Sequence, residues 1–313
     1  MKIVFFGSGS FALPILAHLH KMLDIALVVT RPDSARDRGK KVKRSLVAQF
    51  CDDNAIKVIQ PETVNSSEAV EEIKSSGCDM AVLASYSEIL SPEVVGCFKK
   101  GIVNVHPSLL PLYRGAEPIR WPIRRGETET GSTMMLVSSG LDRGNIISQK
   151  KMPIEPNDSY GSLTSKLVEL SNSMLTDALK EVEKGYLGQQ QSQEKTFYAR
   201  KMKPTDEIVD FSNDAEKVSC HIRSMDPEPG VYCLLGGKRF KLFKASVVEG
   251  DGKPGEILET GKTIVVACGH GAVEVGEVQM EGSKRMEAKV FLQSGKIKVG
   301  DFLNCVDLLG LKK

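Results

Sequence analysis

Residues 101–116 read GIVNVHPSLLPLYRGA, and this stretch predicts a buried strand that ends in polar side chains. Its first six residues are rich in β-branched side chains, which a buried strand prefers. Asn104 and His106 share one face near the strand end because strand side chains alternate, and Pro107 then ends the ladder. An amide and an imidazole in this position suit a site where negative charge develops. Alternatively, both side chains only satisfy backbone groups at the rim of a sheet.

Strands and helices alternate around this stretch, from the N-terminus to about residue 185. The expected strands cover residues 2–6, 25–29, 56–59, 80–84, 101–106, 131–137 and 145–149, and the expected helices cover residues 12–22, 45–54, 66–75, 92–98, 118–125 and 161–185. This order predicts an α/β domain with a mostly parallel, Rossmann-like sheet covered by helices on both faces. Ligands of such sheets bind at the carboxyl ends of the strands, where Asn104, His106 and the loop at residues 85–90 are expected.

Asp142 is the acidic residue that we expect at the same edge of the sheet. It lies in the sequence GLDRG at residues 140–144, where two glycines indicate a tight loop between strands. Aspartate in such a loop is usually a turn residue. Its carboxylate could instead reach His106 and keep the imidazole charged or oriented.

The turn after the first strand has the spacing of a dinucleotide-binding motif. Residues 7–12 read GSGSFA, which matches the pattern G-x-G-x-x-A. The second strand should then end in an acid that binds the ribose, but Thr30, Arg31 and Pro32 follow it. This missing contact argues against an NAD(P) site.

A basic segment follows at residues 31–44, RPDSARDRGKKVKR. It holds seven basic and two acidic residues, a local excess of five positive charges in a chain whose net charge is +2. Pro32 and Gly39 favour a mobile surface loop. Such a loop suits an anionic partner, including the phosphates of RNA, although most charge runs are simply solvated.

The last third of the chain changes character. Residues 189–206 are polar and lack any helical or strand period, so we interpret them as a linker. Beyond them a possible helix at residues 214–223 precedes short strands that are separated by glycines, at residues 230–235, 239–248, 255–259, 263–267 and 272–280. These strands favour a small β-barrel of the OB-like kind. We therefore expect an α/β domain at residues 1–188, a linker at 189–206 and a barrel at 207–313.

Composition narrows the class of protein further. The 313 residues are enough for two domains, and the small net charge does not by itself indicate a nucleic-acid partner. The seven cysteines form no Cys-x-x-Cys pair, which suggests reduced thiols, a cytoplasmic protein and no metal site. We find no apolar run long enough for a bilayer, and the N-terminal MKIVFFG is expected to be a strand rather than a signal peptide.

Several of these motifs together resemble a known family. Asn104-x-His106, the sequence SLLPLYRGA at residues 108–116 and Gly140-Leu141-Asp142-x-Gly144 are similar to the signature of the formyltransferases that use 10-formyltetrahydrofolate. The basic loop, the sequence YARK at residues 198–201 and the sequence PEPG at residues 227–230 resemble the methionyl-tRNA formyltransferases in particular. The resemblance covers nearly the full length of the chain.

The resemblance implies a function and a set of site residues. It implies formyl transfer from 10-formyltetrahydrofolate, without a metal, to the amino group of initiator methionyl-tRNA, by a protein that we expect to be a cytoplasmic monomer. Asn104, His106 and Asp142 would be the catalytic residues. The folate would contact Ser85, Tyr86, Ser87, Ile89, Leu90, Ser108, Leu109, Leu110 and Pro111. The tRNA would contact Arg38, Lys40, Lys41, Lys43 and Arg44, with Arg38 reading the acceptor stem and the linker and barrel holding the tRNA body.

Other functions remain open at this stage. A formyltransferase acting on a small amine shares the three catalytic residues but would not need the basic loop or the barrel. A formyltetrahydrofolate hydrolase also shares them and would release formate. An NAD(P) oxidoreductase would use only the first glycine turn, and a non-catalytic RNA-binding protein would leave the folate unchanged.

Overall fold

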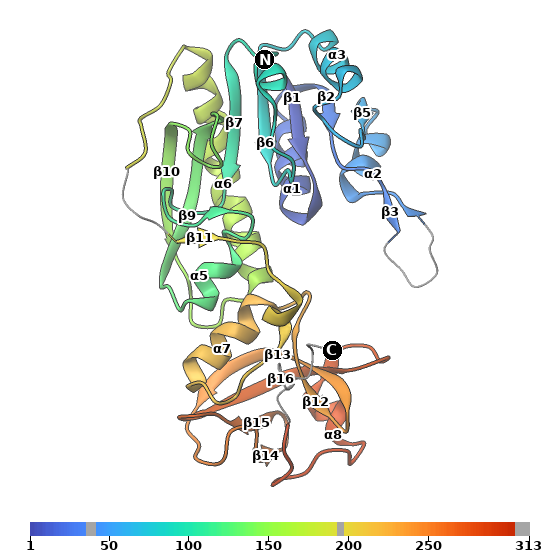
Figure 1. Cartoon of the computed structure of the whole chain (residues 1–313), viewed down its shortest axis with the longest axis vertical. Coiled ribbons are helices and arrows are strands. Elements are labelled where there is room, and N and C mark those ends of the chain that lie inside the picture. The colour runs from blue at the N-terminus through green and yellow to red at the C-terminus, as the bar shows by residue number, and fades with distance from the viewer. Residues whose placement is uncertain (36–41, 193–196, 304–313) are drawn as a thin grey trace. The chain divides into compact units, whose positions relative to one another are not determined.

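The computed structural model describes residues 1–35, 42–192 and 197–303. The chain divides into two compact units (Figure 1). The first contains Met1–Pro118, Thr130–Met152 and Thr164–Ala199, and the second contains Ile119–Glu129, Pro153–Leu163 and Arg200–Lys313. Two segments of the expected first domain thus pack with the C-terminal residues, and the domain boundaries at residues 188 and 207 stay predictions.

The first unit is built on a seven-stranded sheet. From edge to edge its strands are β10 (Ile146–Pro153), β9 (Glu129–Leu136), β7 (Gly101–His106), β6 (Met80–Ala84), β1 (Lys2–Gly7), β2 (Asp24–Val29) and β5 (Val58–Ile59). The pairs from β7 to β5 are parallel, whereas β9 runs antiparallel to β7. The mostly parallel α/β sheet predicted from the sequence is therefore confirmed.

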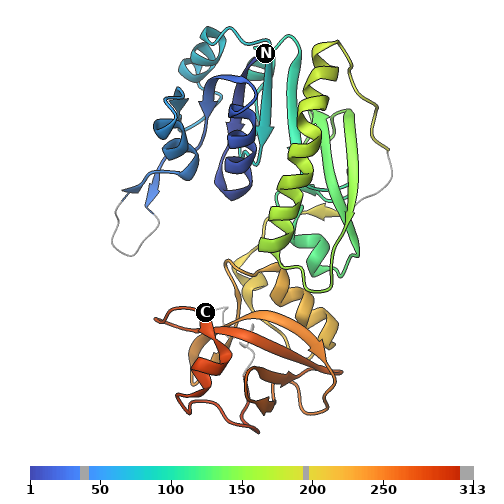
Figure 2. The same ribbon diagram turned by 180° about the vertical axis from the view of Figure 1, so that it is seen from behind.

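Helices cover both faces of this sheet. On one face Val4 and Phe6 of β1 pack in a buried apolar cluster with Val70 of α3 and Val94 of α4. On the other face lie α1 and α6 (Figure 2). Full burial of one large apolar side chain contributes about 1.5–3 kcal/mol, so the side chains buried between the sheet and the helices on its two faces hold the strands in place. The helices of the first unit are α1 (Gly9–His20), α2 (Leu46–Asp53), α3 (Ser67–Ser75), α4 (Pro92–Val95) and most of α6 (Tyr160–Glu183).

Serine residues start three of these helices. The hydroxyl oxygens of Ser45, Ser66 and Ser91 each accept a hydrogen bond from the backbone N–H three residues further on. Each bond satisfies one of the free N–H groups of a helix N-terminus, a contribution of about 1 kcal/mol.

Two short strand pairs lie outside the large sheet. β8 (Arg114–Gly115) pairs in parallel with β11 (Tyr198–Ala199), which brings part of the expected linker to the segment after β7. β3 (Ser34–Ala35) pairs antiparallel with β4 (Val42–Lys43). The basic segment was expected to be a loop throughout, but its two stems form a ladder because their backbone groups satisfy each other.

The second unit contains an antiparallel sheet. Its strands follow the order β12 (Val231–Leu235), β13 (Lys238–Val248), β16 (Ala272–Met280), β15 (Ile264–Ala267) and β14 (Ile257–Thr260), with β17 (Met286–Glu287) paired to β16. Phe211, Phe240 and Val275 belong to its buried core. The predicted barrel is not confirmed, since no sheet among the described residues closes on itself. The other elements of this unit are α5 (Arg120–Arg124), the 3₁₀ helix η1 (Pro204–Glu207), α7 (Ala215–Ser224) and α8 (Ala288–Leu292).

The sequence did not predict α8, because five residues are too few to show a helical period. Within the described part of the chain, no helix combines the length and apolar character that crossing a membrane requires.

Candidate active site

Strand β7 delivers two of the predicted catalytic residues. Asn104 and His106 stand on one face of the strand, and their side chains are buried, with 6% and 4% of their surface exposed. β7 is held between β6 and β9, where Asn104 pairs with Leu83 and Met135. A strand hydrogen-bonded on both sides cannot shift its register without turning every side chain over, so both residues are fixed in orientation.

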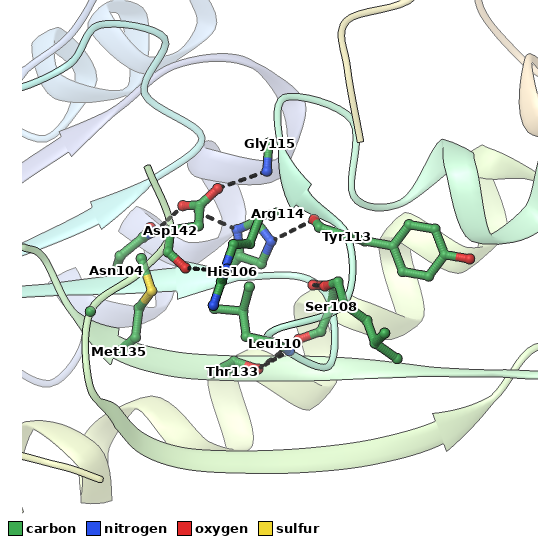
Figure 3. Close-up of polar contacts among 12 residues, drawn as sticks. Asn104, His106, Ser108, Leu110, Tyr113, Arg114, Gly115, Thr133, Met135 and Asp142 are labelled. Atoms are coloured by element: carbon green, nitrogen blue, oxygen red, sulfur yellow. Dashed lines mark hydrogen bonds and ion pairs between the residues drawn. The ribbon is translucent and has the colours of Figure 1, made fainter. Parts of the chain in front are cut away.

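Asp142 reaches the same place from the loop between β9 and β10 (Figure 3). Its Oδ1 atom lies 3.4 Å from Nδ2 of Asn104 and 3.7 Å from Nδ1 of His106. Its Oδ2 atom accepts a hydrogen bond of 2.8 Å from the backbone N–H of Gly115. The structure thus brings together the three side chains that the sequence proposed as a unit.

The loop that carries Asp142 is tightly constrained. Asp142 adopts φ +51°, a left-handed conformation that costs a non-glycine residue about 1–3 kcal/mol. A β-carbon on Gly144 would lie 1.5 Å from the carbonyl oxygen of Leu136, so the chain passes too close to β9 for any side chain there. The surroundings must therefore hold this loop in a conformation that it would not adopt alone.

A backbone carbonyl faces one ring nitrogen of His106. Its Nε2 atom lies 3.1 Å from the carbonyl oxygen of Tyr113, and Nε2 carries a hydrogen because a carbonyl only accepts (Figure 3). Nδ1 then faces Oδ1 of Asp142 at 3.7 Å. A proton on Nδ1 would therefore face a carboxylate oxygen, which is an attractive contact. Tyr113 itself holds φ +60°, a second strained residue at the site.

The predicted folate contacts lie on two segments that leave the sheet at one edge, since β6 and β7 are parallel neighbours. Ser85, Tyr86, Ser87, Ile89 and Leu90 follow β6, and Ser108, Leu109, Leu110 and Pro111 follow β7.

Hydrogen bonds within the segment after β7, and from it to β9, hold this segment in place. The hydroxyl of Ser108 donates to the carbonyl of Leu112, and the backbone N–H of Leu110 donates to Oγ1 of Thr133. Ser108 and Leu110 are almost fully buried. Both residues therefore stabilise the segment, and their contact with a ligand stays a prediction.

The segment after β6 is anchored at both ends. Ser85, with φ +51°, accepts hydrogen bonds at its carbonyl from the backbone and hydroxyl of Ser8. The Glu88 carboxylate accepts hydrogen bonds from the hydroxyl of Thr63 and from the backbone N–H of Val64. Directly after the second anchor the side chain of Ile89 is 77% exposed, an apolar surface that a ligand could cover.

Tyr86 contributes a half-buried phenol to this segment. Burial first, and the charge of Glu88 second, raise its pKa to about 12. Its ring packs edge-on against Phe6, with centroids 5.9 Å apart. The phenol therefore stays neutral and can donate a hydrogen bond at any physiological pH.

The predicted tRNA contacts are the part of the site that the structure describes least. Arg38, Lys40 and Lys41 lie outside the described residues, and Lys43 is described in its backbone only, as part of β4. Arg44 forms a two-point ion pair with Asp52, with both N–O distances at 2.8 Å, and a longer one with Asp33. These contacts raise the pKa of Arg44 and give the side chain an intramolecular role as well.

The sequence missed Arg114 and Gln191 as site residues. Arg114 donates from Nε to the carbonyl oxygen of Asp142 at 3.1 Å, and Gln191 donates to the same oxygen at 2.9 Å. Burial, followed by the charge of Arg143, lowers the pKa of Arg114. Arg114 was visible only as part of the motif at residues 108–116, and Gln191 lies in a polar segment whose composition gives no signal.

Comparison with known proteins places this site in a family. Residues 1–179 match the family model described as formyl transferase, and residues 201–296 match the model described as formyl transferase, C-terminal domain. The chain is 37% identical over 310 residues to a methionyl-tRNA formyltransferase of Citrifermentans bemidjiense, covering 98% of both sequences. It is 38% identical over 308 residues to a methionyl-tRNA formyltransferase of Caldanaerobacter subterraneus subsp. tengcongensis, covering 97% of this chain and 100% of that protein.

Among solved structures, HypX from Aquifex aeolicus in complex with tetrahydrofolic acid superposes with a TM-score of 0.68 at 19% identity. The match covers 96% of this chain and 48% of that protein, and at this identity it supports the fold alone. The family models and the near full-length relatives go further. The chain belongs to the formyl transferase family.

Proposed function

We propose that this protein transfers the formyl group of 10-formyltetrahydrofolate to the free amino group of methionyl-initiator tRNA, giving N-formylmethionyl-tRNA. The observation that carries the proposal is the convergence of Asn104, His106 and Asp142 in one buried site. The names of the near full-length relatives support the choice of methionyl-tRNA as the acceptor.

The first chemical step is attack of the methionine amine on the formyl carbon. The formyl oxygen gains negative charge in the tetrahedral intermediate that follows. The Asn104 amide and the Nδ1–H of a protonated His106 are the donors that would bind this oxygen. Loss of one such donor raises the barrier by about 2.7–4 kcal/mol.

Asp142 has two tasks in this mechanism. Its ionised carboxylate favours the charged form of His106, whose Nδ1 atom it faces at 3.7 Å. It also accepts the proton that the attacking amine loses, directly or through water, and returns a proton to the leaving nitrogen of the folate. The intermediate then collapses as the bond between the formyl carbon and the folate nitrogen breaks. Proton loss at one nitrogen and gain at the other keep the reaction balanced, and no covalent enzyme intermediate is needed.

The co-substrate 10-formyltetrahydrofolate would lie over the two segments after β6 and β7. The exposed Ile89 and the neutral phenol of Tyr86 fit a ligand with an apolar ring system and polar edges. The nine predicted contact residues remain proposals.

The basic segment would bind the acceptor end of the tRNA. Its local excess of five positive charges supports this role, because phosphate contacts dominate the affinity for nucleic acids. We further propose that Arg38 reads the acceptor stem. A small barrel at residues 207–313 that holds the tRNA body, a monomeric state and a cytoplasmic location complete the proposal.

The test is incubation of the purified protein with 10-formyltetrahydrofolate and methionyl-initiator tRNA. Elongator methionyl-tRNA and other aminoacyl-tRNAs serve as controls. We expect formylation of the initiator species, dependent on both substrates. Release of formate without an amine would instead indicate a hydrolase, and no change in the folate would contradict formyl transfer altogether.

A further inference from the structure

Gln191 is a buried glutamine in the segment that the sequence suggested was a linker. Its side chain is 5% exposed, whereas the neighbouring Gln190 and Ser192 are exposed. Two residues earlier, Gln189 exchanges two backbone hydrogen bonds of 2.8 Å with Ile146, at the start of β10. The glutamine side chain is therefore anchored beside the loop that carries Asp142.

Every polar atom of this side chain is engaged with that loop or with Arg114. The Nε2 atom donates to the carbonyl oxygens of Asp142, at 2.9 Å, and Gly144, at 2.8 Å. The Oε1 atom accepts from Nη2 and Nε of Arg114, at 2.6 and 3.1 Å. A side-chain amide has two hydrogens to donate, and here both are directed at the backbone of one loop.

The loop depends on such external bonds. Asp142 has a strained φ of +51°, and the adjacent Leu141 is 47% exposed, so little apolar burial stabilises the turn. The carboxylate of Asp142 projects from this turn toward Asn104 and His106. A change of the backbone at Asp142 would therefore move the carboxylate directly.

The same segment also supports the opposite side of the site. The carbonyl of Phe197 accepts a hydrogen bond of 3.2 Å from the backbone N–H of Tyr113, whose own carbonyl faces Nε2 of His106. Ala199 pairs with Gly115, whose N–H binds the Asp142 carboxylate. The segment thus bonds to residues on both sides of the His106–Asp142 pair.

We infer that Gln191 is a positioning residue for the reaction: it holds the backbone of residues 142–144 so that the Asp142 carboxylate faces Asn104 and His106. The inference rests on the proposed function for its kinetic consequence. Gln191 acts through Asp142, because its amide is committed to the loop carbonyls and to Arg114.

Two substitutions separate the contacts of this side chain. Gln191→Met keeps the length and removes every hydrogen bond. Gln191→Glu keeps acceptor oxygens for Arg114 but places a carboxylate against two carbonyl oxygens, which only accept. Gln190→Ala is the matched control, since it changes an exposed glutamine one position away.

We expect both Gln191 variants to lower kcat for formyl transfer by about 10- to 100-fold, since small misplacements of a catalytic group cost this much. KM for the folate and for methionyl-tRNA should stay close to the wild-type values, and Gln190→Ala should behave as wild type. Normal kcat in Gln191→Met would overturn the inference. Activity retained in Gln191→Glu but lost in Gln191→Met would also overturn it, because the role would then belong to Arg114.

A second readout needs no substrate. The backbone N–H of Gly115 binds the Asp142 carboxylate, so its hydrogen exchange, followed by NMR, reports where that carboxylate lies. In the Gln191 variants Gly115 should exchange faster while amides of β1 and β6 keep their protection. Unchanged Gly115 exchange would overturn the inference even if the wild-type protein proved to catalyse another reaction. Uniform loss of protection would show a general structural role instead.

Discussion

The Nδ1 atom of His106 lies 3.7 Å from the Oδ1 atom of Asp142, with both side chains almost fully buried. This separation is close enough for an ion pair and too long for a hydrogen bond, so a proton on Nδ1 would not be committed to the carboxylate. The other imidazole nitrogen is held by the Tyr113 carbonyl, which fixes the plane of the ring. The pair can therefore support charge on His106 while leaving one donor for a substrate oxygen.

Replacing Asp142 by asparagine tests the charge of this pair. Asp142→Asn keeps the shape and an acceptor for the Gly115 N–H, but it removes the negative charge that supports imidazolium. We expect kcat to fall by about 10²-fold or more, as for loss of a proton-transfer group, with little change in KM. Steady-state formylation of methionyl-tRNA checks this, with Ser139→Ala, an exposed position in the same loop region, as control. Near-normal turnover would remove Asp142 from the mechanism.

Replacing Asn104 tests the oxyanion donor. Asn104→Ala removes one of the two proposed donors, an amide whose Nδ2 atom lies 3.4 Å from Oδ1 of Asp142. A barrier increase of about 2.7–4 kcal/mol predicts a fall in kcat of about 10²- to 10³-fold. The melting temperature measured on the same samples separates this effect from unfolding. A variant that is folded and fully active would argue against a role for the amide.

Two glycines of the Asp142 loop give a matched pair of substitutions. In Gly144→Ala the new β-carbon would lie 1.5 Å from the carbonyl oxygen of Leu136, which is backbone and cannot move aside. In Gly140→Ala the nearest atom, at 2.9 Å, belongs to the flexible side chain of Arg143. We expect Gly144→Ala to lower the free energy of unfolding by about 1–3 kcal/mol and to lose most of its activity. Gly140→Ala should be close to wild type in both stability and activity. Urea unfolding measures the stability of each variant, and kcat measures its activity. Equal stability and activity in Gly144→Ala and Gly140→Ala would contradict the assigned loop geometry.

His221 should make the second unit sensitive to acid. Burial first, and the charge of Arg124 second, lower the pKa of His221 from 6.5 to about 4. The unfolded chain therefore takes up a proton as the pH falls below 6.5, and the folded chain does so only near pH 4. The stability due to neutral His221 is complete above this window and is lost as the pH falls through it, by on the order of 3 kcal/mol.

His221→Gln should remove that dependence. Urea unfolding at pH 7.0 and pH 4.5 measures it, and the variant should lose less stability between these two values than wild type. Asp206, whose carbonyl contacts His221, titrates in a lower window: although burial alone would raise its pKa, hydrogen bonds from Arg200 and Lys203 lower it to about 2. Equal losses in variant and wild type would show that His221 does not titrate as described.

Arg38 tests the role of the basic segment in tRNA use. We expect Arg38→Ala to weaken the use of methionyl-tRNA while folate binding stays as in wild type, because the two substrates would contact different segments. The use of tRNA is measured as KM for methionyl-tRNA, and folate binding is measured as affinity in a fluorescence titration. An equal loss of both would indicate a structural role for Arg38.

The sequence predicted the central strands well because their signals are strong. β6 and β7 have the predicted bounds, since each is a short apolar run with polar residues and turns on both sides. The proximity of Asn104, His106 and Asp142 followed from the rule that carboxyl ends of strands share an edge, together with the family resemblance.

What the sequence could not predict depends on contacts between distant segments. β8 and β11 have two residues each, too few for any period, and they form only because they meet each other. Gln191 becomes a site residue through bonds to Asp142, Gly144 and Arg114 that no local pattern records. Arg44 was assigned to the tRNA as part of the basic segment, and the structure adds an ion pair with Asp52 that the sequence did not predict.

The most direct test of the account is the single-turnover rate of N-formylmethionyl-tRNA formation by His106→Ala, Asp142→Asn and the double variant. If His106 acts on the formyl oxygen through the charge that Asp142 supports, the account predicts that each single variant is slow and that the double variant is hardly slower than the slower single one. A wild-type rate in His106→Ala, or losses that multiply in the double variant, would contradict it.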